Sequence, residues 1–231
     1  IDNWVLVCPE RYSKDSNEII KNFTEVSYGM GVNVKTPMCL YFNGEHYKDY
    51  EMALENNMNT IKKASYVLVI MPDRDNKFQY GAVKTFLCAH VPVTSQCIKI
   101  SNVFKQKSIA TNLAIQAQAK LNGMPWKVLL PFEGNIEHCI MVIGIHEIVS
   151  QKASTAKTVS GGFSATLDDK CGSYFNKIFH RIPKEDLVAT LTKYLLKALE
   201  EFKKKNSQYP YAVLIYREGV SEGAVAKMVC F

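Results

Sequence analysis

Short apolar runs alternate with amphipathic stretches over the first half of the chain. Runs typical of buried strands occur at 4–9, 38–42, 66–72 and 96–100. Apolar residues spaced by three and four predict helices at 14–30, 47–62, 79–89 and 108–121. This alternation of strand and helix predicts a parallel sheet with helices on its faces. In such sheets ligands bind beyond the carboxyl ends of the strands and at helix N-termini.

The pattern changes after a short connector that contains Pro125 and Pro131. Three successive strands, a helix and a further strand are predicted at 139–149, 157–167, 172–182, 184–205 and 211–217. Three antiparallel strands, a helix and a parallel strand form the opening of an RNase H-like fold. We therefore expect two domains, 1–130 and 131–231.

Composition narrows the class of protein only slightly. The chain has 231 residues, of which 47% are hydrophobic and 22% charged, as in ordinary globular proteins. A net charge of +6 permits binding to a phosphate backbone without establishing it. No apolar run approaches the roughly 20 residues of a membrane span, and no secretory signal is present, so we expect no membrane association.

The seven cysteines are scattered and form no CxxC pair. This distribution favours buried free thiols in a reducing, intracellular compartment and argues against a zinc site. It does not distinguish cytoplasm from nucleus. The chain begins at Ile1 without an initiator Met and ends inside the apolar run 226–231. We therefore expect a fragment whose second domain is truncated at its C-terminus.

The segment 211–223, YAVLIYREGVSEG, carries the clearest chemical signal. An apolar strand delivers Glu218 to its carboxyl end, and a glycine turn follows. Carboxylates at strand ends are how many nucleases hold divalent metal ions. The sequence of this segment resembles the YRDGVSEG motif of the PIWI domain in the Argonaute/Piwi family.

Further motifs extend this resemblance over nearly the whole chain. They are YGAVK at 80–84, TSQC at 94–97 and the stretch 108–123, which ends in KLNG. Phe86-Leu-Cys88 is similar to the Piwi branch, whose guides are piRNAs, rather than to microRNA-type Argonautes. The resemblance implies a Rossmann-like MID domain with a parallel sheet, followed by an RNase H-like PIWI domain.

In this family the matching MID residues bind the 5′-phosphate of a small guide RNA. The resemblance assigns Lys84 and Lys120 to the phosphate oxygens, Gln96 to a hydrogen bond with the phosphate, and Tyr80 to stacking on the first base. These residue types suit that chemistry. The alternative for Tyr80 and Lys84 is a solvated pair four residues apart on one helix face.

Gln116 lies four residues before Lys120 and shares its helix face. Where microRNA-type Argonautes commonly have lysine, Piwi-type pockets use a glutamine that helps to hold a metal ion. The resemblance therefore implies Mg²⁺ at the guide 5′-phosphate. Glutamine is a weak ligand alone, so the ion would also need the phosphate and a chain-terminal carboxylate. The alternative is an ordinary surface glutamine.

The PIWI half should hold the family's slicer site, and three of its positions can be matched. His146 stands where the family has the first aspartate; the alternative is an ordinary strand residue without a role. Asp186 stands where it has a glutamate, 40 residues after His146 and 32 before Glu218. Glu218 replaces the last aspartate. Histidine cannot bridge two Mg²⁺ ions as a carboxylate does, and the two acids have changed length. Glu147 is not expected to compensate, because adjacent strand residues point to opposite faces.

Three functions remain open from the sequence. The first is a small-RNA-guided binding protein that pairs with a complementary target RNA and silences through effector proteins without cleavage. The second is an active slicer endoribonuclease with an altered metal-binding set, so an enzymatic activity is undecided. The third is a degenerate scaffold without RNA, which the intact set of Tyr80, Lys84, Gln96 and Lys120 argues against.

Overall fold

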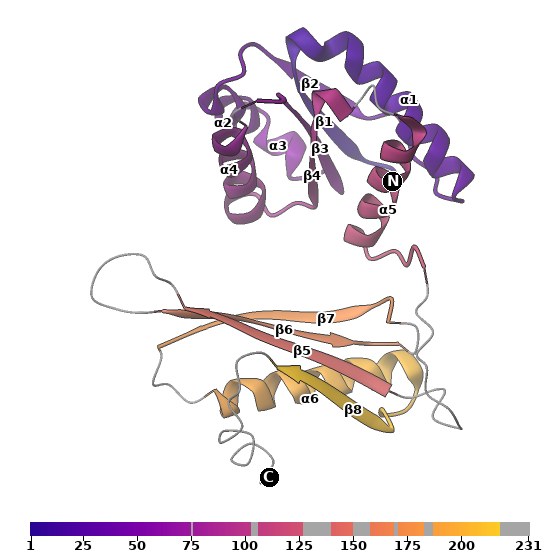
Figure 1. Ribbon diagram of the computed structural model, residues 1–231, viewed down its shortest axis with the longest axis vertical. Coiled ribbons are helices and arrows are strands. Elements are labelled where there is room, and N and C mark those ends of the chain that lie inside the picture. The colour runs from indigo at the N-terminus through magenta and orange to yellow at the C-terminus, as the bar shows by residue number, and fades with distance from the viewer. Residues whose placement is uncertain are drawn as a thin grey trace. The chain divides into compact units, whose positions relative to one another are not determined.

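The computed structural model describes residues 1–74, 76–102, 106–126, 140–149, 158–168, 171–182 and 187–217. The chain divides into two compact units, Ile1–Gly123 and Met124–Phe231 (Figure 1). The domain boundary predicted near residue 130 lies outside the described residues. Each unit has its own sheet and core, and each is considered by itself below.

The first unit is built on a four-stranded, fully parallel sheet with the order β2-β1-β3-β4. Its strands are β1 (Trp4–Pro9), β2 (Met38–Phe42), β3 (Tyr66–Met71) and β4 (Ser95–Lys99). Its α-helices are α1 (Ser13–Gly29), α2 (Tyr47–Asn56), α3 (Met58–Ile61), α4 (Lys77–Thr85) and α5 (Gln106–Lys120). The parallel sheet predicted from the alternating pattern is therefore confirmed.

Both faces of this sheet are covered, which explains why β1 and β3 are buried at every residue. Side chains that alternate along the strands pack beneath different helices. Trp4 and Leu6 join the core formed with α1 and α5, and Val5 and Val7 join the core formed with α2 and α4. Figure 1 shows α1 and α5 on one side of the sheet and α2, α3 and α4 on the other.

Two predicted helices are interrupted. The helix expected over 47–62 divides at Asn57, whose side-chain amide donates to the carbonyl of Ala53 at 2.8 Å and so competes with the helical backbone. The helix expected over 79–89 ends as α4 at Thr85 and continues as a π-helical turn, Phe86–His90. The amide of Val91 closes this turn on the carbonyl of Phe86 at 2.8 Å.

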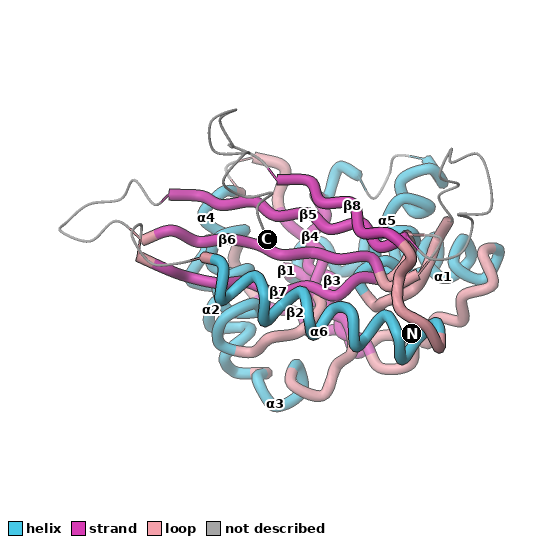
Figure 2. The backbone as a smooth tube through the Cα atoms, turned by 90° about the horizontal axis from the view of Figure 1, so that it is seen from below, coloured by secondary structure: helices cyan, strands magenta, loops and turns pink. Residues whose placement is uncertain are grey.

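The second unit has the predicted RNase H-like opening. The strand order is β7-β6-β5-β8, with β5 antiparallel to β6, β6 antiparallel to β7, and β8 parallel to β5. The elements are β5 (Ile140–Val149), β6 (Val159–Thr166), β7 (Tyr174–Arg181), α6 (Val188–Asn206) and β8 (Ala212–Arg217). Figure 2 shows α6 running along the sheet.

The two faces of the second sheet differ. On one face Met141, Ile143 and Ile145 of β5 pack with Phe163 of β6 and Phe202 of α6. The intervening residues of β5 point to the opposite face. None of the described helices is long and apolar enough to span a membrane.

Candidate functional site

The side chains of Lys84 and Lys120 converge on one backbone oxygen in the first unit. Lys84 lies near the end of α4, and its Nζ donates to the carbonyl of Ser95 at 3.0 Å and to the hydroxyl of Ser95 at 2.8 Å. Lys120 is the last residue of α5, and its Nζ donates to the same carbonyl at 2.8 Å. Two ammonium groups from different helices are thus held at the beginning of β4.

Gln96 and Tyr80 complete this arrangement. Lys120 donates to Oε1 of Gln96 at 2.6 Å, and the ammonium of Lys84 lies 5.9 Å from the ring centre of Tyr80. The Tyr80 side chain is half exposed, which leaves its ring accessible for stacking. The four residues predicted from the sequence therefore lie together. The additional residue is Ser95, whose only sequence signal was its place before Gln96 in the SQC motif.

The electrostatics of this cluster favour an anion. Within the described part of the chain, no carboxylate forms an ion pair with Lys84 or Lys120. Burial and the neighbouring charge of Lys84 lower the pKa of Lys120. A bound anion would offset both effects, because it supplies the opposite charge that the two ammonium groups lack.

Gln116 lies on α5, one turn before Lys120, and is exposed. Its amide offers a single oxygen, whereas Mg²⁺ requires near-octahedral oxygen coordination. The described residues contain no cluster of three or more histidine, cysteine, aspartate or glutamate side chains that could hold a metal ion. The chain's own donors therefore fit Mg²⁺ only if phosphate oxygens supply most of the coordination.

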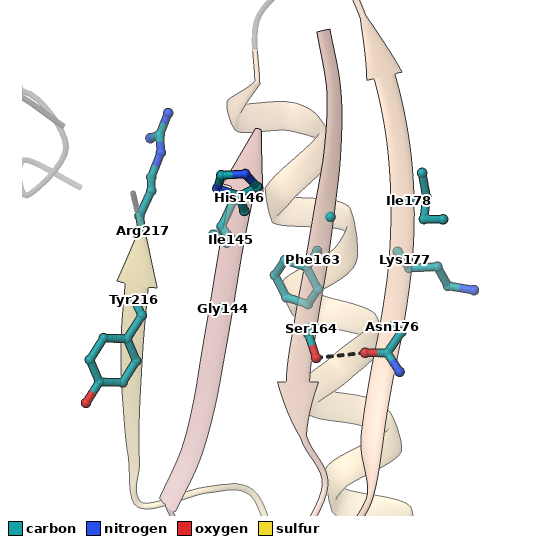
Figure 3. A pocket seen from close by; sticks show the side chains of 11 residues that line it. Gly144, Ile145, His146, Phe163, Ser164, Asn176, Lys177, Ile178, Tyr216 and Arg217 are labelled. Atoms are coloured by element: carbon teal, nitrogen blue, oxygen red, sulfur yellow. Dashed lines mark hydrogen bonds between the residues drawn. The ribbon is translucent and has the colours of Figure 1, made fainter. Parts of the chain in front are cut away.

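Of the three residues predicted from the sequence at slicer positions, only His146 can be placed, because Asp186 and Glu218 lie outside the described residues. His146 is exposed on β5, on the face of the second sheet opposite α6. It borders an open depression of about 730 Å³ that crosses all four strands (Figure 3). Gly144 and Gly162 lie among its lining residues.

The described residues that line this depression differ in how far their charges face it. His146 points to this face, whereas Arg217 pairs with Glu147, and Lys177 and Arg217 occupy strand positions aligned with Phe163 and Ile145 of the opposite face. None of the described lining residues is a carboxylate. Asn176 and Ser164 add polar groups and are hydrogen-bonded to each other at 2.7 Å (Figure 3).

Glu147 does not face this depression, in agreement with the expectation from strand alternation. Its carboxylate accepts two hydrogen bonds from Arg181, at 2.8 and 3.2 Å, and lies 3.7 Å from the guanidinium of Arg217. All three side chains are largely buried. Glu147 therefore joins the ends of β5, β7 and β8 through an ion-pair cluster.

A parallel-sheet α/β unit followed by an RNase H-like unit is the architecture of a MID–PIWI lobe. The chain superposes on the MID–PIWI domains of N. crassa QDE-2 with a TM-score of 0.80, 17% identity and coverage of 100% of this chain and 66% of that one. It superposes on Kluyveromyces polysporus Argonaute, solved with a guide RNA, with a TM-score of 0.75, 15% identity and coverage of 96% and 28%.

Sequence comparison gives the family. The Piwi domain family matches residues 66–231. Piwi-like protein 1 of Gallus gallus is 27% identical over 235 residues, which cover 99% of this chain and 26% of that protein. The chain thus spans about a quarter of the length of this relative. The chain belongs to the Argonaute/Piwi family.

Proposed function

We propose that this chain anchors the 5′-monophosphate of a small guide RNA and holds the guide for pairing with a complementary target RNA. Members of the family act in small-RNA silencing. The observation that carries the proposal is the convergence of Lys84 and Lys120 on the carbonyl of Ser95 without a carboxylate partner among the described residues.

Each residue of the cluster has a separate task in this proposal. The two ammonium groups exchange part of their contact with Ser95 for charge-assisted hydrogen bonds to phosphate oxygens. The amide of Gln96 donates to a third phosphate oxygen. The exposed face of Tyr80 stacks on the first base of the guide. The four side chains already lie together before the RNA binds. Little conformational entropy is therefore lost on binding.

We further propose that the protein acts without cleaving the target and silences through effector proteins. The support is the replacement of an aspartate by His146 at the first slicer position, and the absence of carboxylates among the described residues that line the adjacent depression. A two-metal site needs anionic oxygens between its ions. No feature of the described residues favours the slicer alternative.

The experiment that tests this function is recovery of the RNA that accompanies the protein from its source. Small RNAs with 5′-monophosphates, identified by ligation before and after phosphatase treatment, are the expected result. Recovery of no RNA, or of RNA with mixed 5′ ends, would contradict the proposal.

A metal contribution at the phosphate can be tested separately. If Gln116 helps to hold Mg²⁺ at the bound phosphate, EDTA should weaken binding of 5′-phosphorylated RNA and Mg²⁺ should restore it. Gln116→Lys should make binding less sensitive to EDTA, because a fixed ammonium then replaces the ion. The full-length protein is the right material, since a chain-terminal carboxylate would share the ion. Affinity unaffected by EDTA in the parent protein would rule out the metal.

A further inference from the structure

Three aromatic side chains form a continuous surface at the carboxyl edge of the parallel sheet. His46 and Tyr47 follow β2, and Phe78 lies in the first turn of α4, after β3. The ring centres of His46 and Tyr47 are 4.4 Å apart, and those of Tyr47 and Phe78 are 6.3 Å apart. Phe78 is 72% exposed. We call these three residues the aromatic surface.

The backbone around the aromatic surface is fixed by hydrogen bonds. The carboxylate of Asp49 accepts the amide of His46 at 2.8 Å, and Nδ1 of His46 accepts the amide of Lys48 at 3.5 Å, which together form a capping box at the start of α2. The side chain of Gln79 donates to the carbonyl of Glu45 at 2.8 Å and so ties α4 to the β2–α2 loop. The rings are therefore positioned before any ligand binds.

Two exposed lysines adjoin residues of the aromatic surface in the sequence. Lys48 directly follows Tyr47, and Lys77 directly precedes Phe78. Both lysines are exposed, and neither pairs with a carboxylate of the described residues.

The neighbouring acids are engaged elsewhere. Glu45 pairs with Arg11 at 3.0 Å, Asp49 closes the capping box, and Asp73 accepts the amide of Ser101 at 2.9 Å. Arg11 compensates the charge of Glu45, whereas Asp49 and Asp73 remain charged and are held by backbone amides. Their carboxylates are thus fixed in position and form no ion pair with either lysine in the described part of the chain.

We propose that the aromatic surface, with Lys48 and Lys77, is a second contact for single-stranded RNA. Exposed rings stack on bases of any sequence, and flanking lysines neutralise the phosphates between those bases. A protein partner would need a larger apolar area, on the order of 800 Å² per partner, than three rings supply. The proposal relies on the proposed function only for the kind of ligand.

This contact is separate from the guide 5′-phosphate cluster. Lys84 reaches Ser95 at the beginning of β4, whereas Phe78 follows the end of β3. The separation of six positions between Phe78 and Lys84 corresponds to about 9 Å along the axis of α4. RNA on the aromatic surface would thus meet the protein beyond the first base, which Tyr80 receives between the two sites.

The test uses an unstructured RNA with a 5′-hydroxyl and the chain carrying Lys84→Ala and Lys120→Ala, so that the 5′-phosphate cluster does not contribute. In this background Tyr47→Ala with Phe78→Ala should raise the Kd for RNA about tenfold, in the range that one stacked base contributes. Lys48→Ala with Lys77→Ala should reduce the slope of log affinity against log salt by about 1.4. Tyr28→Ala, which removes an 80% exposed ring on α1, is the matched control and should change neither quantity.

A direct readout separates stacking from a loss of folding. Phe78→Trp in a Trp126→Phe background places a reporter on the aromatic surface, since the other tryptophan, Trp4, is buried. RNA should quench this reporter while affinity stays close to that of the parent. Absence of quenching at saturating RNA, or an unchanged Kd in the Tyr47→Ala, Phe78→Ala variant, would overturn the proposal. Both results are independent of whether the 5′-phosphate is recognised.

Discussion

Replacing Lys84 and Lys120 together with alanine is expected to weaken binding of 5′-phosphorylated RNA about 100-fold, since two charge-assisted hydrogen bonds to the phosphate are lost. Binding of the same RNA with a 5′-hydroxyl should change far less, because that end offers no charge to the two ammonium groups. The measurement is the Kd of each RNA by fluorescence anisotropy at one fixed salt concentration.

The control for this prediction is a pair of exposed lysines elsewhere in the first unit. Lys14→Ala with Lys62→Ala removes the same charge from residues outside the cluster and should lower the affinity for both RNAs slightly and equally. Thermal unfolding of both double variants checks that the contacts with Ser95 are not needed for folding. Equal losses for the two RNA ends in the Lys84, Lys120 variant would contradict the assignment.

Guided cleavage of a fully paired target is expected to be undetectable. In the assignment by resemblance, His146 stands in place of an anionic metal ligand, and Asp186 and Glu218 each differ from the family residue by one methylene, which would displace a carboxylate by about one bond length. Misplacement of about 1 Å at a catalytic centre can cost about 100-fold in rate. The measurement is a single-turnover assay with Mg²⁺ or Mn²⁺ and a labelled target.

Changing the three residues back to the family residues tests the prediction of no cleavage more strictly. Single changes should restore nothing, because the ligands of a metal site act as a unit. The triple change His146→Asp, Asp186→Glu and Glu218→Asp should produce measurable cutting opposite the middle of the guide, provided that the remaining slicer residue of the full-length protein is competent. Metal-dependent cutting at that position by the unmodified protein would establish the slicer alternative instead.

Much of the fold could be predicted because its elements have strong periodic patterns. β1 and β3 are continuous apolar runs, and α6 has apolar residues every three or four positions, so type and order follow from local sequence. The interruption at Asn57 and the π-helical turn after Thr85 could not be predicted. The first depends on the hydrogen bond from the Asn57 side chain to the carbonyl of Ala53, and the second on the hydrogen bond from the amide of Val91 to the carbonyl of Phe86. The pattern of apolar residues encodes neither bond.

The residues of the 5′-phosphate cluster could be predicted from the sequence, whereas the contacts that hold them and those around Glu147 could not. Lys84, Gln96 and Lys120 were identified by their motifs, but the carbonyl of Ser95 that joins them is a backbone group, which carries no residue-type signal. The pairing of Glu147 with Arg181 was also missed. Strand alternation places these side chains on a face, yet the register of β5, β6 and β7 that brings them together is a tertiary property.

The most direct test of the account is the ratio of two dissociation constants for the unmodified chain, measured with one RNA sequence bearing either a 5′-monophosphate or a 5′-hydroxyl. Binding through two lysines and a glutamine predicts that the phosphorylated RNA binds about 100-fold more tightly at physiological salt. Equal dissociation constants for the two RNAs would contradict the claim that this chain anchors a guide by its 5′ end.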